Sequence, residues 1–269
     1  MLLRSSLRRP PTRLLLARAG RRASSSFWSS QPNVPPELAA LLDNGVGRGV
    51  GARSELAATL AASWRAELVG EPRPAPGGGT SLAYTLRAGA SPTQGADVAV
   101  LRAAIFPADQ AGDVATGLLF APQCHPALPL NLASAPLIEA AVAGVRERGA
   151  DRVAAVAALP GLCAWIVEQQ AWEGRGFDDE QAGAVVAVAR GEPRPGHSVL
   201  GEGTFKAAQT ALEALALEYA SRHGADTECT AFAEAGASLQ GIHYMHETSP
   251  DALRDSAGCT ASFEFPPAS

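Results

Sequence analysis

Two spacings of apolar residues recur along the chain and predict its strands and helices. Alternation of apolar and polar residues is typical of a strand that is buried on one face. A short, continuous apolar run bounded by turn residues is typical of a strand buried on both faces. On these criteria we predict strands over residues 80–89, 96–106, 152–159, 236–247 and 259–265.

Apolar residues spaced three and four apart predict the helices. The clearest helix follows Ser134, a good N-cap residue, and carries Pro136 in its first turn, where the missing N–H costs nothing. Residues 171–203 are polar and rich in glycine and proline, which predicts a long connection whose order the sequence leaves open. We predict helices over residues 55–68, 135–148, 163–170 and 204–222.

The order of these elements predicts the fold class. Two strands, a helix, a strand and a helix are followed by a further helix and two strands. This order favours an α/β or α+β fold, built as one mixed β-sheet flanked by helices. We expect a single domain over residues 53–269, preceded by a linker over residues 31–52.

Residues 1–30 differ in composition from the rest of the chain. They contain seven arginines, several serines and leucines and no acidic residue, and the first carboxylate is Glu37. This composition is typical of a disordered organelle transit peptide. We therefore predict import into the mitochondrial matrix, with a plastid as the second choice and a plain basic tail as the alternative. The apolar run Leu14–Leu16 is too short for a membrane span.

The remaining composition excludes several classes of function. Without residues 1–30 the net charge is −12, which argues against nucleic-acid binding because phosphate backbones need a basic face. The hydrophobic content of 46% is that of a globular protein with a sizeable core. No cysteine pair has the spacing of a zinc site or a disulfide framework, so we predict neither a metal nor a cofactor. The cysteines are Cys124, Cys163, Cys229 and Cys259.

Motifs in the second half of the chain resemble those of malonyl-CoA decarboxylases. Pro160, Gly161 and Trp165 keep the skeleton of that family's Pro-Gly-Phe-x-x-Trp turn, which follows a helix and a strand. Residues 123–128 are similar to a short Cys-Gln-containing run of the family. The family's closing block is matched by Gly236-Ala237, Tyr244-Met245, Ser249 and Ser256-x-Gly258. The resemblance covers residues 50–265.

The resemblance implies a GNAT-like acyl-CoA fold and a cofactor-free reaction. In that reaction malonyl-CoA gives acetyl-CoA and CO₂ as part of fatty-acid metabolism. It also implies that the partner is malonyl-CoA or another acyl-CoA, and it leaves a homo-oligomer open.

The residues at the family's catalytic positions depart from its pattern. Where the family has its catalytic serine, this chain has Phe120-Ala121-Pro122, and where it has its catalytic histidine, Phe232 is followed by Ala233. An enolate needs a hydrogen-bond donor and a proton donor, which proline and alanine do not supply.

Three residues are fallback candidates for these roles, namely Cys124, His125 and His243. Cys124 and His125 are adjacent on an extended segment, so we do not expect them to face each other. His243 and His246 lie three apart on a predicted strand, which places them on opposite faces.

CoA-binding residues are predicted at two places. A helix N-terminus binds a pyrophosphate through its backbone N–H groups, and the helix after Ser134 offers one. Phe106 to Asp113 forms the loop nearest the acyl chain if the resemblance holds. The alternative for both stretches is an ordinary capped helix and an ordinary loop. The predicted residues are Phe106, Asp113, Ser134, Ala135 and Leu137.

Three functions therefore compete. The first is a malonyl-CoA decarboxylase-like enzyme. The second is a non-catalytic acyl-CoA-binding or assembly relative, a pseudoenzyme that kept the fold and lost the catalytic pair. The third is a GNAT-like acyltransferase that uses acyl-CoA as donor.

Overall fold

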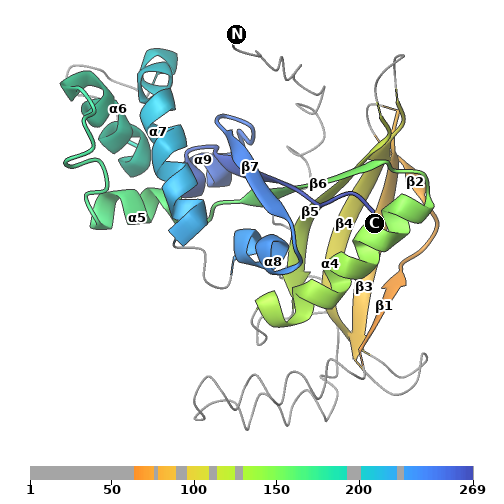
Figure 1. Cartoon of the computed structure of the whole chain (residues 1–269). Helices are drawn as coiled ribbons and strands as arrows, with labels where there is room; N and C mark the ends of the chain where they lie inside the picture. The colour runs from red at the N-terminus through yellow and green to blue at the C-terminus, as the bar shows by residue number, and fades with distance from the viewer. Residues whose placement is uncertain are drawn as a thin grey trace, which may run out of the picture.

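One mixed sheet connects the two halves of the chain in the computed structural model (Figure 1). The structure describes residues 64–75, 78–88, 96–108, 114–124, 130–192, 201–222 and 227–268. The eight-stranded sheet has the order β1-β3-β4-β5-β6-β8-β7, with β2 paired to β3. The strands are β1 Arg65–Leu68, β2 Arg73–Pro74, β3 Thr80–Ala88, β4 Ala96–Phe106, β5 Thr116–Cys124, β6 Arg152–Ala158, β7 Ser238–His243 and β8 Thr260–Glu264. Every neighbouring pair is antiparallel except β5 and β6, which are parallel.

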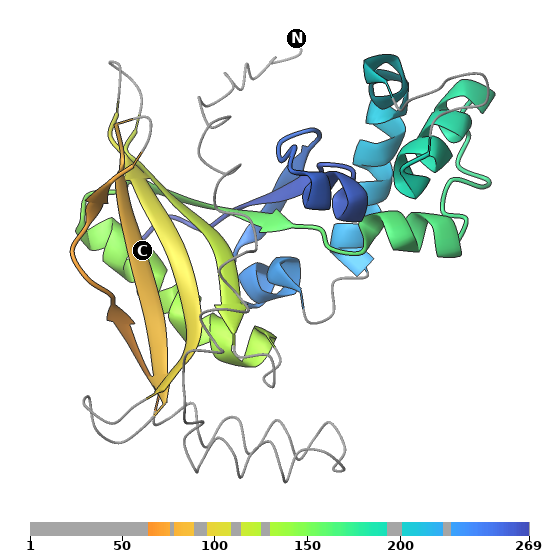
Figure 2. The ribbon, with the colours of Figure 1, turned by 180° about the vertical axis from the view of Figure 1, so that it is seen from behind.

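The helices separate into two groups around this sheet (Figures 1 and 2). They are α4 Leu130–Glu147, α5 Leu162–Glu168, α6 Asp179–Arg190, α7 Glu202–Arg222, α8 Glu228–Glu234 and α9 Pro250–Ser256. Helix α4 lies along one face of β3, β4 and β5, while α5, α6, α7 and α9 pack together beyond the end of β6. Helix α8 contacts α4, β6, β7 and β8 and so lies between the two groups.

The alternation along β3 explains the packing of α4. Leu82, Tyr84 and Leu86 are buried on one side of the strand. Helix α4 packs on that side, and its apolar residues three and four apart, among them Val145, are buried against the sheet. A Cβ at Gly117 of β5 would lie 2.9 Å from Val145 Cγ2, so α4 approaches β5 closely because that position has no side chain.

The predicted fold class is confirmed, since a mixed sheet is flanked by helices. The predicted strand over 96–106 and the helix over 204–222 match β4 and α7 closely, and the strand predicted from residue 152 matches β6. No described helix is long and apolar enough to cross a membrane. The predicted transit peptide, the linker and most of the first helix lie outside the described residues.

The end of the helix predicted over 55–68 is wrong. Residues 65–68 form β1, whose partners on β3 run from Arg87 to Tyr84. Trp64 is buried just before this strand. Backbone pairing at the sheet edge overrides the helical spacing of the side chains here.

The long connection predicted over 171–203 contains a helix, α6. The Asp178 carboxylate accepts the Gln181 backbone N–H at 2.7 Å, and the Gln181 side chain accepts the Asp178 backbone N–H at 3.2 Å. This reciprocal capping box is visible in the sequence as an aspartate followed three residues later by a glutamine. Residues 193–200 of the same stretch lie outside the described residues.

Candidate functional site

The parallel strands β5 and β6 part before either of them ends. Their pairing runs from Thr116 with Arg152 to Phe120 with Val156, whereas β5 continues to Cys124 and β6 to Ala158. Beyond Val156, strand β6 is paired only with β8 among the residues that the structure describes. Within that part of the chain, the edge of β6 that faces β5 is open at its carboxyl end, the usual position of a ligand in an open α/β sheet.

A bulge in β5 marks the point of parting. Ala121 and Pro122 together stand opposite Leu101 of β4, and Ala121 has a φ of 51°. Pro122 has no N–H to give to a ladder, so the bulge accommodates it. The sequence did not predict β5, because Pro122 and Gly117 both argue against a strand. The bulge bends β5 at the place where it leaves β6.

Side chains from two helices hold the end of β6. The Ala158 N–H donates to Glu228 Oε2 of α8 at 2.8 Å. The Tyr219 hydroxyl of α7 donates to the Pro160 carbonyl oxygen at 2.6 Å. Gly161 follows with a φ of 81°, in the left-handed region that glycine favours, and α5 begins at the next residue. The Pro-Gly pair is thus the turn between β6 and α5.

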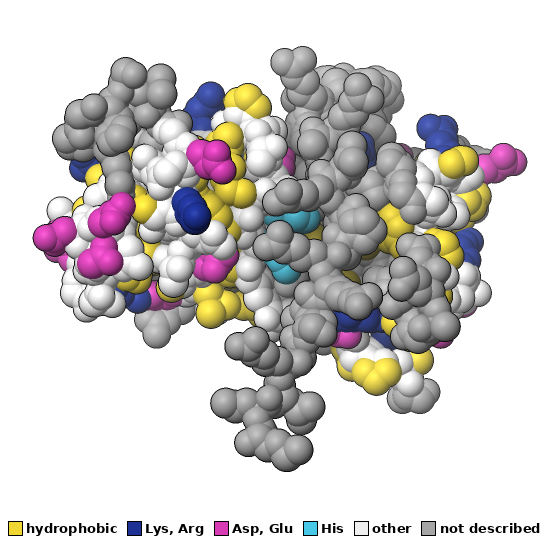
Figure 3. Space-filling model, turned by 90° about the horizontal axis from the view of Figure 1, so that it is seen from above, with side chains coloured by type: hydrophobic (Ala, Val, Ile, Leu, Met, Phe, Trp, Pro, Cys, Tyr) yellow, Lys and Arg dark blue, Asp and Glu magenta, His cyan; other side chains and the backbone are white. Residues whose placement is uncertain are grey.

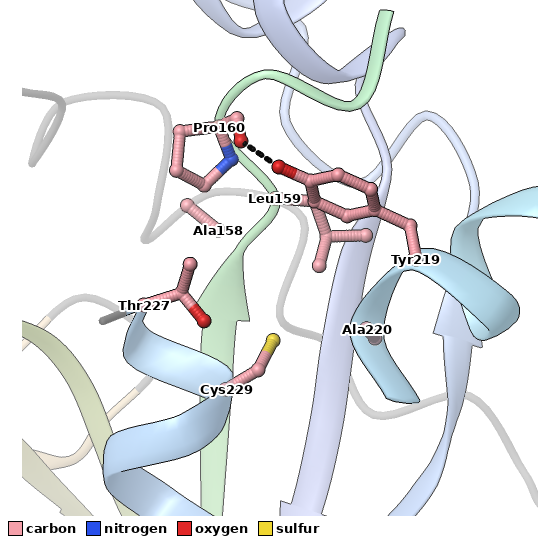
Figure 4. Close-up of a pocket in the computed structure, with 7 residues that line it drawn as sticks. All are labelled: Ala158, Leu159, Pro160, Tyr219, Ala220, Thr227 and Cys229. Carbon is pink, nitrogen blue, oxygen red and sulfur yellow. Dashed lines mark hydrogen bonds between the residues drawn. The ribbon is translucent and has the colours of Figure 1, made fainter. Parts of the chain in front are cut away.

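A small hollow lies at this end of β6 (Figure 4). It is lined by Ala158, Leu159, Pro160, Tyr219, Ala220, Thr227 and Cys229. The empty space between these side chains is about 160 Å³ when open solvent is counted, but it leaves no room for a water molecule. The lining side chains therefore close the hollow, and a ligand there would have to displace them.

Neither Pro122 nor Ala233, the two residues that the resemblance places at the catalytic positions, has a side chain that can donate a proton. Pro122 is buried in β5, and Ala233 is exposed on α8. Phe232, next to Ala233, is fully buried, with its ring centroid 5.9 Å from that of Phe263. Of the fallback candidates, Cys124 is half-buried at the end of β5, and His125 lies outside the described residues.

The four cysteines are not in disulfides. Burial raises the pKa of Cys163 and of Cys229 to about 12, and it also raises the pKa of Cys259. These three thiols are therefore protonated at neutral pH, which is typical of structural cysteines.

The helix N-terminus predicted at Ser134 is wrong. Helix α4 begins at Leu130, because the four residues before Ser134 contain no helix breaker, and Pro136 lies inside it. Ser134 is 1% exposed and Leu137 is 0% exposed, and the Ser134 hydroxyl has no hydrogen-bond partner in the described structure. Burial of this segment between sheet and helices overrides the capping preference of serine. The N-cap argument for CoA binding at Ser134, Ala135 and Leu137 thus fails, although their binding role stays a prediction.

The other predicted CoA contacts lie at the end of β4. Phe106 is half-buried and its ring packs over Gly79, where a Cβ would lie 2.9 Å from Phe106 Cδ1. Asp113 lies outside the described residues. The role of both residues stays a prediction.

The predicted separation of His243 and His246 is wrong. Strand β7 ends at His243, and Met245 has a φ of 52°, so the chain turns back and the two imidazole centroids lie 5.9 Å apart. His246 Nδ1 is 2.9 Å from the Thr260 hydroxyl. Figure 3 shows the described histidines together at the surface between the helical group and the sheet.

The histidine pair lies in line with the open end of β6. Thr260 of β8 is the register partner of both Ala158 of β6 and His243 of β7. Neighbouring strands are about 4.8 Å apart, so Ala158 and His243 are separated by roughly 10 Å across the sheet. We call Ala158, Thr260 and His243 a row across the sheet. The sequence did not predict this row, since the register between distant strands leaves no signal in the local sequence.

The imidazoles favour the neutral form. Partial burial lowers the pKa of both histidines, and the charge of His243 lowers that of His246 further. For His243, the carboxylate of Glu213 on α7 opposes the effect. A neutral imidazole can accept a proton near neutral pH, and the imidazolium that results can donate one. No group of three or more His, Cys, Asp or Glu suited to a metal occurs in the part of the chain that the structure describes.

Comparison with solved structures identifies the fold. No protein-family model matches the chain, and no curated protein matches it in sequence. A crystal structure of malonyl-CoA decarboxylase from Rhodopseudomonas palustris is similar, with a TM-score of 0.58 and 11% identity over 85% of this chain and 63% of that one. Malonyl-CoA decarboxylase from Cupriavidus metallidurans gives a TM-score of 0.54 and 11% identity over 85% of this chain and 69% of that one.

These two similarities concern the fold alone, because the identity is 11% in both. The chain spans 63% of the length of the first structure and 69% of the second. The motifs that predicted this resemblance lie in the turn after β6 and the start of α5, in the block from β7 to β8, and at residues 123–128, of which only the first two, at the end of β5, are described. The chain has the GNAT-like mixed-sheet fold found in malonyl-CoA decarboxylases.

Proposed function

We propose that this protein binds acyl-CoA at the open edge between β5 and β6 and does not decarboxylate malonyl-CoA by a serine–histidine route. The observation that carries the proposal is the parting of β5 from β6, and it is supported by Pro122 and Ala233 at the positions where the resemblance implies a catalytic serine and histidine. The parted strands support binding of an extended ligand. Proline and alanine supply neither the hydrogen-bond donor nor the proton donor that decarboxylation needs.

The loss of chemistry follows from what decarboxylation requires. Expelling CO₂ from a malonyl thioester leaves an enolate, whose oxygen needs a hydrogen-bond donor and whose carbon needs a proton. Loss of one positioned donor costs about 10²–10³ in rate. Loss of the general acid costs a further factor of about 10²–10⁴. Neither the Pro122 ring nor the Ala233 methyl replaces these groups.

Binding does not need the catalytic pair. The pantetheine arm of CoA is an extended chain with two amide groups, and such a chain can add to an open strand edge through backbone hydrogen bonds. Strand β6 presents such an edge beyond Val156. The hollow beside Ala158 is closed by its lining side chains, so a ligand at this edge would have to open it.

A second candidate function is decarboxylation that uses the histidine pair. The close approach of His243 and His246, with His246 held by Thr260, favours this alternative. Because their row across the sheet includes Ala158, a proton from the imidazolium form of either histidine would start roughly 10 Å from the proposed edge. A ligand that bends over β8 would have to close that distance.

The full-length chain separates these functions in one pair of measurements. We expect acetyl-CoA to raise the melting temperature, because a ligand that binds only the folded state stabilises it. We expect malonyl-CoA to yield no acetyl-CoA above the uncatalysed rate. Turnover that disappears in the His243→Ala/His246→Ala double variant would instead establish the second candidate. No stabilisation by either thioester would refute binding.

A further inference from the structure

The open edge of β6 is occupied by a carboxylate of the chain itself. The Val153 carbonyl accepts the Phe265 N–H, so Val153 points its backbone groups toward β8. Backbone groups alternate along a strand, and those of Val156 and Ala158 therefore point toward β5. Val156 is the last residue of β6 paired with β5, and the next N–H on that side, at Ala158, donates to Glu228 Oε2 at 2.8 Å.

Helix α8 positions this carboxylate firmly. Phe232, one turn after Glu228, is fully buried, and its ring centroid lies 5.9 Å from that of Phe263 and 6.4 Å from that of Phe265. Thr227, before Glu228, is the N-cap of α8 and accepts the Thr230 N–H. The start of α8 is therefore fixed beside the end of β6.

The hollow lies beside the same hydrogen bond. Thr227 and Cys229, on either side of Glu228, line it together with Ala158 (Figure 4). A ligand that used the Ala158 N–H would have to displace the Glu228 carboxylate and move the side chains that close the hollow.

We infer that Glu228 is an internal competitor for the acyl-CoA site, holding the Ala158 N–H that an amide carbonyl of the pantetheine arm takes when the ligand binds. The inference rests on the proposed function and adds an autoinhibitory contact to it. In the free protein the carboxylate satisfies the open edge. In the bound protein it swings away and the ligand replaces it.

Two physical effects contribute to the competition, and two variants separate them. Glu228→Ala removes both the competing hydrogen bond and the negative charge, which also repels an anionic ligand. Glu228→Gln keeps an acceptor for the Ala158 N–H but removes the charge, and a neutral acceptor forms a weaker bond than a carboxylate. Glu234, exposed at the other end of α8, provides the matched control as Glu234→Ala.

Isothermal titration of the full-length variants with acetyl-CoA tests the inference. A hydrogen bond to a charged group is strong enough to change a binding constant by about 10-fold. We therefore expect Glu228→Ala to bind acetyl-CoA about 10-fold more tightly than the wild type. We expect a gain of about 3-fold for Glu228→Gln and none for Glu234→Ala. Adenosine 3′,5′-bisphosphate, which lacks the pantetheine arm, should bind Glu228→Gln and Glu228→Ala no better than the wild type, apart from the small effect of charge.

The outcomes distinguish this inference from the function on which it rests. Equal affinity of wild type and Glu228→Gln for acetyl-CoA overturns the competition but leaves acyl-CoA binding intact. This comparison stands even if Glu228→Ala fails to fold after losing the partner of the Ala158 N–H. Absence of binding in the wild type and in both variants overturns the proposed function itself.

Discussion

The two ends of β6 are held in different ways. At the Arg152 end the strand is paired on both sides, with β5 and with β8, and the Arg152 guanidinium forms two hydrogen bonds of 2.8 Å to Glu264. At the Ala158 end the ladder to β5 is missing, and side chains of Glu228 and Tyr219 satisfy the backbone instead. We call these the closed end and the open end.

The difference teaches where a ligand can enter. Buried backbone groups must be hydrogen-bonded, and a strand ladder meets this need with groups that cannot move without unfolding the sheet. A side chain meets the same need but can rotate away. The closed end is therefore expected to contribute stability, and the open end is expected to exchange its partners for those of a ligand.

The largest expected effect lies at the closed end. Gly117, paired with Val153, has no room for a side chain, because a Cβ there would lie 2.9 Å from Val145 Cγ2 and 3.3 Å from the Ala150 Cβ. We expect Gly117→Val to lower the free energy of unfolding by about 1–3 kcal/mol through overpacking. Urea denaturation measures the loss.

A compensating change provides the control for this prediction. Val145→Ala in the Gly117→Val background removes the clashing methyl groups and should recover part of the stability. An unchanged midpoint in Gly117→Val alone would contradict close packing at the closed end.

A smaller effect is expected at the open end. Tyr219→Phe removes the hydroxyl that donates to the Pro160 carbonyl at 2.6 Å. We expect a loss of about 1 kcal/mol in the free energy of unfolding, the usual contribution of one hydrogen bond. Tyr244→Phe is the matched control, because the Tyr244 hydroxyl donates to the Phe205 carbonyl at 2.8 Å. A much larger loss for Tyr219→Phe than for Tyr244→Phe would mean that the open end is as rigid as the closed end.

The smallest effect concerns the pH dependence of stability, to which His243 and His246 beside the open end contribute. Partial burial lowers the pKa of His243 and His246 in the folded state. A histidine whose folded pKa is below its unfolded value, about 6.5, stabilises the protein above that value and loses this contribution as pH falls through the folded pKa. Between about pH 7.5 and about pH 5, we expect the double variant His243→Asn/His246→Asn to lose less free energy of unfolding than the wild type loses.

Melting temperatures at several pH values measure this difference. The effect is small because His243 is only partly buried and the Glu213 carboxylate opposes the lowering of its pKa. Identical pH profiles for the wild type and the double variant would show that these imidazoles titrate as in the unfolded chain.

The local sequence pattern was sufficient to predict a helix or strand where its surroundings in the fold are the same along its whole length. Helix α7 and strand β4 were predicted closely because their apolar spacing is regular from end to end. Helix α6 was missed although its capping box, Asp178 with Gln181, is written in the sequence. Strand β5 was missed because Pro122 and Gly117 oppose a strand locally, and only its neighbours β4 and β6 make it one.

For the candidate site, the motifs predicted that Pro122 and Ala233 replace a catalytic pair, and this stays a prediction. The meeting of His243 with His246 was not foreseen, since the strand period was extended past Met245, where the backbone turns. Nothing near Glu228 in the sequence marks it, because its partner is 70 residues away.

The amino-acid sequence by itself determined the fold class, most of the strands and the acidic balance of the chain after residue 30. These properties depend on residue types and on spacings within one element, which a single segment carries. Only the tertiary structure decided where β5 leaves β6, which carboxylate closes the open edge, and which residues share the row from Ala158 through Thr260 to His243. Register and long-range hydrogen bonds are decided by the packing of the whole sheet, because segments distant in sequence compete for the same backbone partners.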